Sequence, residues 1–223
     1  MSYLRQIWAI VKKDITAELH TRETTSAMFV FAALSMLIFS FALDLQGRAA
    51  KAVAPGALWT TIVFAGTLGL NRAMAREQQT GSIEGLLLAP IDRTAIFFGK
   101  ALGNLILMLA VEVILLPLGS ALFNVAFLKP SVTFPIVLGT IGYATIGTLI
   151  AAIAINTRAR EVMLPLLLIP LAIPLLIAAV QATGNLVQGA TLHTVNGWIQ
   201  LLIIYDLLSI AIALLTFQYV AEE

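Results

Sequence analysis

The chain has 223 residues, of which 60% are hydrophobic and only 11% are charged, and its mean hydropathy is +0.96. Soluble domains carry about 25% charged residues, so this composition excludes a water-soluble protein and indicates that lipid is the main solvent. The sequence contains no cysteine, which excludes disulfides, thiol redox chemistry and thiolate metal sites.

Residues 1–22 predict an amphipathic helix that lies in the headgroup plane of a membrane, with Trp8 at the interface. Ile10 and Glu18 interrupt its pattern, and two interpretations remain open. The helix is either an ordinary surface anchor or an elbow helix that packs on the membrane spans and moves with them. Its apolar stripe, at helical spacing, consists of Leu4, Ile7, Trp8, Val11, Ile15 and Leu19.

Six apolar segments follow, and each can supply about the 20 residues that a helix needs to cross the bilayer core, although the second is short. Backbone groups in that core must bond within their own segment, which charge-poor helices achieve. We therefore expect an all-α integral membrane protein with about six transmembrane helices in one domain, residues 1–223. The expected spans are Thr25–Leu43, Pro55–Leu70, Ala95–Val125, Val132–Ile155, Val162–Ala182 and Trp198–Val220.

Residues 71–94, between the second and third spans, are the most informative part of the chain. Gly81 can end the helix that continues from the second span, because glycine adopts the left-handed conformation at low cost. Ser82 can cap a new short helix, in which the helix dipole favours Glu84 in the first turn. Pro90 ends that helix. The loop therefore predicts a short helix outside the membrane.

This short helix has an apolar face, formed by Ile83, Leu86 and Leu87. Because the face lies outside the bilayer, we expect a partner protein to cover it; a turn packed on its own bundle is the alternative. Asp92 or Thr94 can cap the third span. The charges expected at the rim of the partner surface are Arg76, Glu77 and Glu84.

Two carboxylates fall within spans, Glu112 in the third and Asp206 in the sixth. A carboxylate at membrane depth is costly and usually faces the bundle interior, so coupling or substrate contact is one interpretation. The other is a structural hydrogen bond to Asn104, Ser209 or Tyr205 on neighbouring helices. For Asp206, which is next to Tyr205, we favour this second interpretation.

The fifth span contains Pro165, Pro170 and Pro174, which should kink or interrupt it. Interrupted helices often line translocation paths. A kink that serves packing alone is the other interpretation.

The distribution of lysine and arginine predicts which loops face the cytoplasm. Ten of these residues lie on the side of the N-terminus and three on the other side, so both termini should be cytoplasmic and the membrane a bacterial inner membrane. The larger group is Arg5, Lys12, Lys13, Arg22, Arg72, Arg76, Arg93, Lys100, Arg158 and Arg160, and the smaller is Arg48, Lys51 and Lys129.

The segment Glu77–Pro90 resembles the E-x-x-x-G-[ST]-[IL]-E-x-L-x-x-x-P coupling element of the ABC-2 permease superfamily. With Ala54–Trp59 opening the second span and Leu164–Ala178 in the fifth, the chain more closely resembles the CcmB family of haem-exporter membrane subunits. Asn71 departs from the acidic residue expected before the arginine. The ATPase-coupling residues that the resemblance implies are Arg76, Glu77, Gly81, Ser82, Ile83, Glu84, Leu86, Leu87 and Pro90.

The resemblance implies a permease subunit that pairs with a second copy, with CcmA-like ATPase subunits and with a CcmC-like haem-handling membrane subunit. ATP hydrolysis by the partner would drive haem export or release of a haem chaperone in cytochrome c maturation. An ABC-2 exporter of lipid, drug or polysaccharide is an alternative, as is an ATPase-independent transporter or scaffold. None of these functions involves nucleic acid.

The chain itself is expected to be non-catalytic. A phosphate-binding Walker A loop does not match, since Thr94 stands in place of the first glycine and alanine follows Lys100. We therefore expect no catalytic residue, no directly bound cofactor and no metal site; ATP would bind the partner, and haem would be handled as substrate.

Overall fold

The structure is a computed structural model that describes residues 3–43, 48–80, 91–154 and 160–220. These ranges form helices and no strand, which confirms the expected all-α fold. The helices are α1 (Tyr3–Thr21), α2 (Glu23–Leu43), α3 (Arg48–Thr80), α5 (Arg93–Phe123), α6 (Pro130–Ala154), α7 (Arg160–Val187) and α8 (Asn196–Val220).

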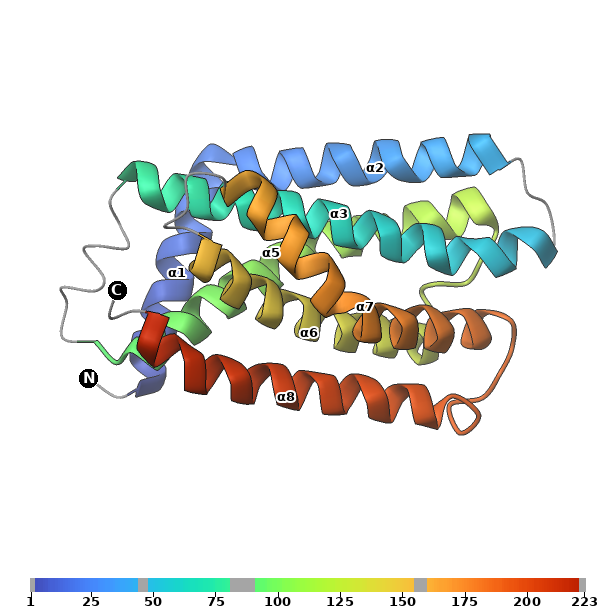
Figure 1. Cartoon of the computed structure of the whole chain (residues 1–223). Helices are drawn as coiled ribbons and strands as arrows, with labels where there is room; N and C mark the ends of the chain where they lie inside the picture. Colours follow the sequence, from blue (N-terminus) through green and yellow to red (C-terminus); the bar gives the residue numbers. More distant parts are fainter. Residues whose placement is uncertain (1–2, 44–47, 81–90, 155–159, 221–223) are drawn as a thin grey trace.

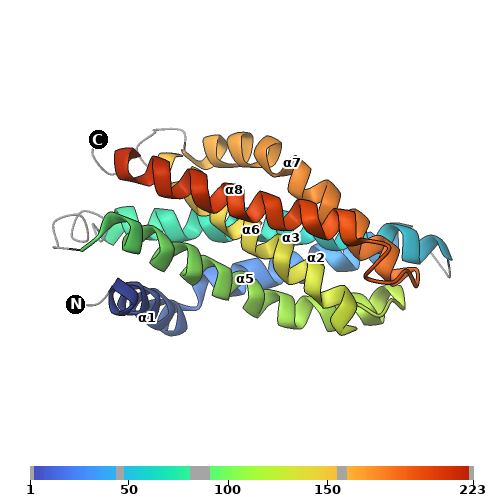
Figure 2. The same ribbon diagram turned by 90° about the horizontal axis from the view of Figure 1, so that it is seen from below.

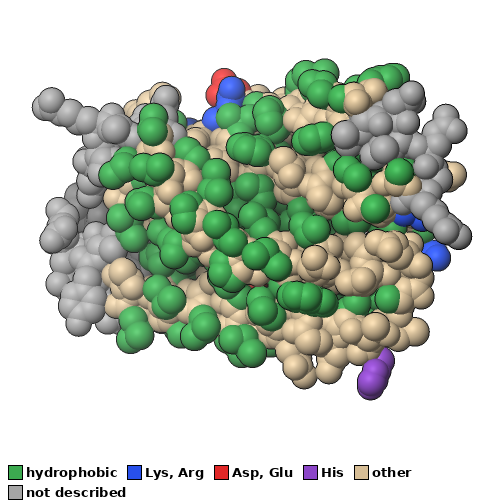
Figure 3. Space-filling view, turned by 45° about the vertical axis from the view of Figure 1, so that its right-hand side comes forward, with side chains coloured by type: hydrophobic (Ala, Val, Ile, Leu, Met, Phe, Trp, Pro, Cys, Tyr) green, Lys and Arg blue, Asp and Glu red, His purple; other side chains and the backbone are tan. Residues whose placement is uncertain are grey.

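Six of the helices, α2, α3, α5, α6, α7 and α8, are long and apolar enough to cross a membrane, as the sequence predicts. They run in alternating directions through one bundle, and α1 lies across the bundle at the end where α8 finishes (Figures 1 and 2). On the face shown in Figure 3, apolar side chains cover the middle and the charged side chains in view lie toward the borders. This surface suits a surrounding of lipid.

The second span is longer than the apolar segment Pro55–Leu70 suggested, because α3 is one helix of 33 residues from Arg48 to Thr80. At a rise of about 1.5 Å per residue it is roughly 50 Å long, whereas the bilayer core is about 30 Å thick. Hydropathy marks only the part in lipid. The helix continues past Leu70 because its polar residues make ion pairs there with α1 and α5.

Helix α6 is the centre of the bundle and packs against α3, α5, α7 and α8. Every residue from 142 to 151 is buried, so this helix is enclosed on all sides. Small residues allow the close approach. A Cβ atom on Gly139 would lie 2.4 Å from the ring of Trp59, and one on Gly147 would lie 2.5 Å from Leu70.

Helix α7 remains continuous across Pro165, Pro170 and Pro174. It bends along its length in both views (Figures 1 and 2), which confirms the expected kink. A proline inside a helix removes one backbone N–H and crowds the preceding turn, so the axis bends away. Helix α8 supports the proline-containing part of α7, since the Tyr205 hydroxyl donates to the carbonyl of Leu171 at 3.0 Å.

The apolar stripe predicted for α1 divides between two surroundings. Ile7 and Val11 are buried against α5, whereas Leu4 and Trp8 remain 76% and 65% exposed, as residues that face lipid or headgroups would be. Ile10, which interrupted the stripe, is 3% exposed. The single-stripe prediction was wrong here because α1 contacts both the bundle and its surroundings, so its apolar surface is wider than one stripe.

Candidate functional site: a charged cluster between α1, α3 and α5

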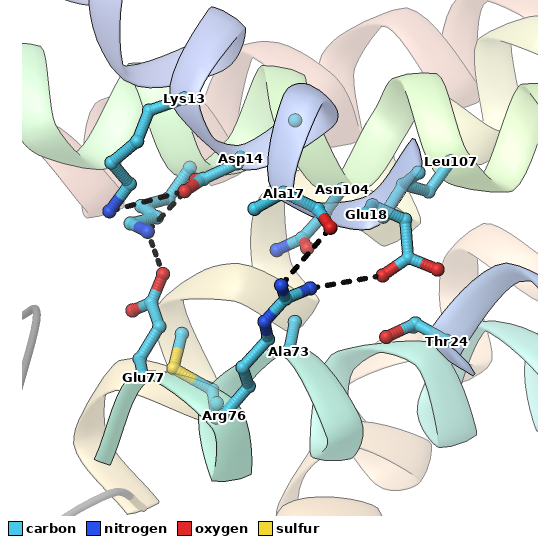
Figure 4. A pocket seen from close by; sticks show the side chains of 13 residues that line it. Lys13, Asp14, Ala17, Glu18, Thr24, Ala73, Arg76, Glu77, Asn104 and Leu107 are labelled. Carbon is cyan, nitrogen blue, oxygen red and sulfur yellow. Dashed lines mark hydrogen bonds and ion pairs between the residues drawn. The ribbon is translucent and has the colours of Figure 1, made fainter. Parts of the chain in front are cut away.

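Charged side chains from three helices converge around a pocket of about 230 Å³ at the end of the bundle where α1 lies (Figure 4). These side chains come from the end of α3 beyond its apolar segment, from the polar face of α1 and from the early turns of α5. We call this group the charged cluster; its members are Lys13, Asp14, Glu18, Arg76, Glu77 and Lys100.

Arg76 reaches from α3 to the last turn of α1 (Figure 4). Its guanidinium donates to the carbonyl of Ala17 at 3.1 Å and to the hydroxyl of Thr21 at 3.2 Å. One nitrogen also lies 3.5 Å from a carboxylate oxygen of Glu18. A cation at this place is favourable because the carbonyls at a helix C-terminus lack partners within the helix and carry partial negative charge.

Glu18 joins the same corner to the next helix. Its other oxygen accepts hydrogen bonds from the Thr25 backbone N–H at 2.7 Å and from the Thr25 hydroxyl at 2.9 Å. Glu18 therefore caps the first turn of α2 while its second oxygen faces Arg76. The turn between α1 and α2 passes through Arg22, whose φ of 55° is left-handed, and this allows the sharp change of direction.

Lys100 is the second link between the helices. Its ammonium lies 2.8 Å from Asp14 on α1 and also pairs with Glu77 on α3. The side chain is only 9% exposed, so these ion pairs are shielded from water far more than surface pairs are. Removing one partner of such a buried set costs more than removing a surface charge, because another charge is left buried without compensation.

Apolar packing holds α1 in register with α5 beside these charges. Ile7 and Val11 pack with Ala95 in a small separate cluster. A Cβ atom on Gly99 would lie 2.8 Å from Ile10, so glycine is needed for this close approach. The position of α1 is thus fixed by both apolar contacts and ion pairs, as the elbow-helix interpretation requires.

Asp92 caps α5, as one of the two predicted alternatives. Its carboxylate accepts hydrogen bonds from the Thr94 backbone N–H at 2.9 Å and the Thr94 hydroxyl at 2.7 Å. These hydrogen bonds lower the pKa of Asp92 from its usual value, because they stabilise the charged form. The N-terminus of α5, the helix that follows the coupling segment, is therefore defined by this cap.

Most of the predicted coupling residues, from Gly81 to Pro90, lie outside the described residues. Arg76 and Glu77 are described, and the structure brings them together with α1 and α5 in the charged cluster. Thr80, the last residue of α3, is four positions beyond Arg76. The cluster therefore stands directly before the predicted coupling helix.

The two intramembrane carboxyl groups have other neighbours than expected. Glu112 lies 2.6 Å from the hydroxyl of Thr140 on α6, and Asn104 instead donates to Thr148. Neither oxygen of Asp206 has a hydrogen-bond partner among the described residues, so the structural hydrogen bond expected for it is not formed. Sequence spacing could not identify these neighbours, because they depend on how α5, α6 and α8 are rotated against one another.

Sequence reasoning missed four members of the charged cluster, Lys13, Asp14, Glu18 and Lys100. Glu18 was noted only as an interruption of the α1 pattern, and Lys100 only in the charge count and in the comparison with a Walker A loop. A lysine seven residues inside the apolar α5, whose first residue is Arg93, was the available signal. A buried cation needs a buried carboxylate, but the sequence does not say which one.

The described cluster contains three cations and three carboxylates, so its formal charges balance. The ion pairs hold α1, α3 and α5 together. Among the described residues, no group of three or more His, Asp or Glu side chains is placed to hold a metal ion.

Six helices are long and apolar enough to cross a membrane, one of them, the glycine-containing α6, is buried among four others, and a charged cluster lies at one end; these features define a multi-pass membrane protein. The family model described as "CcmB protein" matches residues 5–222, and the chain belongs to the CcmB family.

Several known proteins that are similar to this chain share the name "Heme exporter protein B". "Heme exporter protein B" of Rhodobacter capsulatus is 27% identical over 188 residues, which cover 83% of this chain and 85% of that protein. The protein of that name from Paracoccus denitrificans is 28% identical over 155 residues, or 67% of this chain and 69% of the relative. The one from Escherichia coli K12 is 26% identical over 203 residues, or 87% and 88%.

Proposed function

We propose that this chain is the permease subunit of an ATP-driven haem exporter that serves cytochrome c maturation. The single observation that carries the proposal is membership of the CcmB family over nearly the whole chain. The relatives named "Heme exporter protein B" support haem as the substrate class. The chain contributes no catalytic step; a CcmA-like partner ATPase binds and hydrolyses ATP.

The charged cluster supports a mechanical role for this end of the molecule. Residues 81–90 connect the end of α3 to the start of α5. A partner ATPase that pulls on this segment moves α3 and α5 first. The pairs of Arg76 with Glu18 and of Lys100 with Asp14 then carry α1 along. In this proposal α1 is an elbow helix that moves with the spans, and the same movement reaches α2 through Glu18 and Thr25.

The proposed orientation follows from charge and topology together. The first helix and the end of α8 lie at the same end of the bundle, which also contains the charged cluster (Figures 1 and 4). Ten of the 13 lysine and arginine residues belong to that side, so we assign it to the cytoplasm of a bacterial inner membrane. The ATPase subunits bind there, and a second copy and a CcmC-like subunit pack within the membrane.

The decisive test is the double substitution Leu86→Asp with Leu87→Asp. If the predicted helix docks into an ATPase groove, each buried leucine contributes roughly 1.5–3 kcal/mol, and a buried unpaired charge adds a further penalty. The variant should reach the membrane at normal levels but lose its CcmA-like ATPase and cytochrome c maturation. Co-purification in mild detergent, set against membrane abundance, measures this.

The matched control is Leu192→Asp with His193→Asp, which adds two acidic residues at exposed positions near the opposite end of the bundle. This control should keep both the ATPase and maturation. Full ATPase retention by the loop variant would remove residues 81–90 from the coupling role. Loss of the loop variant from the membrane would instead indicate that its apolar face packs on its own bundle.

Export of another substrate by the same ATPase-coupled mechanism is the second candidate, because the motif at Glu77–Pro90 is shared across the ABC-2 superfamily. Deletion of the gene distinguishes the two. Loss of covalently attached haem in c-type cytochromes supports the haem exporter, and normal c-type cytochromes support another substrate.

A further inference from the structure

Two carboxyl groups flank α6 at nearly the same depth in the bundle. Glu112 of α5 contacts Thr140, and a carboxylate oxygen of Asp206 on α8 would lie 2.2 Å from a Cβ atom on Gly142. Residues two apart on a helix differ by about 3 Å along the axis and by about 200° around it. The two groups therefore approach opposite faces of α6 in the middle of the membrane-spanning bundle.

The surroundings of Glu112 do not favour a charge. The residue is 3% exposed, and a small cavity of about 10 Å³ beside it is lined by apolar residues of α2, α3 and α5, among them Met28, Ile62 and Met108. The Glu112 Oε2 atom has no hydrogen-bond donor among the described residues. An ionised carboxylate in such a place would have one neutral hydroxyl as its only described donor, which does not compensate for the loss of water.

The hydrogen bonds available to Thr140 also favour an uncharged Glu112. Its Oγ1 atom lies 3.0 Å from the carbonyl oxygen of Ile136 and 2.6 Å from Glu112 Oε1. A threonine hydroxyl has one hydrogen, and both neighbouring oxygens act only as acceptors if Glu112 is ionised. If Glu112 instead keeps its proton, the carboxylic acid donates to Thr140 and Thr140 donates to Ile136. Both short contacts are then hydrogen bonds.

We propose that Glu112 is a hydrogen-bond donor: its neutral carboxylic acid donates to Thr140 and fastens α5 to the central helix α6. Glu112 is then a positioning residue. The consequence for transport rests on the proposed function, since α5 begins next to the coupling segment and the link carries its movement to α6. The donor role itself is independent of what the protein transports.

Infrared difference spectroscopy of the full-length chain in lipid vesicles tests the donor role directly. A spectrum of the wild type minus Glu112→Gln should show the carbonyl stretching band of a protonated carboxylic acid, and that band should shift in deuterated water. Asp206→Asn is the matched control, because it removes the other intramembrane carboxyl group and should leave the Glu112 band in place. Only carboxylate bands in the Glu112→Gln difference spectrum would overturn the proposal.

Rescue by the conservative variant provides a second measurement. Glutamine supplies a neutral donor, so the melting temperature of Glu112→Gln should lie within about 2 °C of the wild type. This difference is smaller than the shift that a loss of about 1 kcal/mol causes in a chain of this size. Glu112→Leu and Thr140→Val should each lower the melting temperature, and their combination should be no worse than the worse single variant. Glu112→Gln as unstable as Glu112→Leu, or missing from the membrane, would contradict the proposal.

The same variants separate this inference from the proposed function. If the infrared band is present but cytochrome c maturation does not depend on the gene, the donor role holds and the haem-export proposal fails. If maturation depends on the gene and the acid band is absent, the haem-export proposal holds and the donor role fails. With both correct, Glu112→Gln retains maturation and Glu112→Leu loses it.

Discussion

Replacing Arg76 with alanine is the most direct test of how α1 is attached to the end of α3. The substitution removes the hydrogen bonds to Ala17 and Thr21 and the ion pair with Glu18. Glu18 does not become unpartnered, because Thr25 still donates two hydrogen bonds to its other oxygen. The loss of these three interactions weakens the contact between α3 and the corner of α1 and α2.

The expected magnitude follows from exposure. Hydrogen bonds to charged groups contribute about 1.5–3 kcal/mol when buried, and exposed ion pairs contribute about 0–1 kcal/mol. The Arg76 side chain is 33% exposed and the Glu18 side chain 6%. We therefore expect Arg76→Ala to cost about 1–2 kcal/mol in total, and to lower the melting temperature by about 2–8 °C.

The assay is thermal unfolding of the purified chain in detergent. Membrane yield and cytochrome c maturation are measured for the same variants. Arg72→Ala is the matched control, because it removes the same charge one turn earlier on α3 from an exposed position. Glu18→Gln keeps an oxygen for Thr25 but removes the charge that faces Arg76. Combined with Arg76→Ala, it should show a coupling energy of about 0.5–1 kcal/mol.

The reasoning would be refuted if Arg76→Ala had the same melting temperature as Arg72→Ala. It would also be refuted if the stability losses of Arg76→Ala and Glu18→Gln simply added in the double variant. Equal melting would show that the contacts of Arg76 with α1 carry no net energy, and strict additivity would show the same of its ion pair with Glu18. A maturation defect without a stability defect would support a role in coupling rather than in folding.

Three further predictions follow from topology, composition and packing. Reporter fusions after Arg76 should give a cytoplasmic signal and fusions near Lys129 an external one; an external signal at Arg76 would overturn the orientation. The purified chain without partners should hydrolyse no ATP above background, and turnover that survives repurification would contradict its assignment as a permease subunit. Gly142→Val should lower the melting temperature, because a Cβ atom there meets Asp206 and Leu175 at 2.2 and 2.4 Å, whereas Gly56→Val, with nothing within 4 Å, should be milder. Equal effects of the two glycine substitutions would contradict the packing of α6 against α7 and α8.

Much of the fold could be predicted from the sequence because a bilayer imposes simple rules. Apolar length determines the spans, and proline marks the bend in α7. The cap of α5 at Asp92 was also within reach, since capping depends on residues close in sequence. The length of α3 was not, because hydropathy reports where lipid lies and not where a helix ends.

The charged cluster was predicted only in part. Arg76 and Glu77 were identified by their place in a motif, whereas their partners on α1 and α5 were not. A cation in a sequence attracts any carboxylate that comes near it, and the choice of Asp14 for Lys100 depends on α1 lying across the bundle. The motif therefore identified one side of the site.

By itself the sequence determined that this protein crosses a membrane about six times, which residues are costly in lipid, and which loop carries the coupling motif. These properties depend on composition and local order. The tertiary structure alone decided that α6 is enclosed by four helices, that Glu112 lies against Thr140 and that Glu18 joins α1, α2 and α3. The physical reason is that rotation of one helix against another is set by many small packing contacts distributed over several helices, which no single segment encodes.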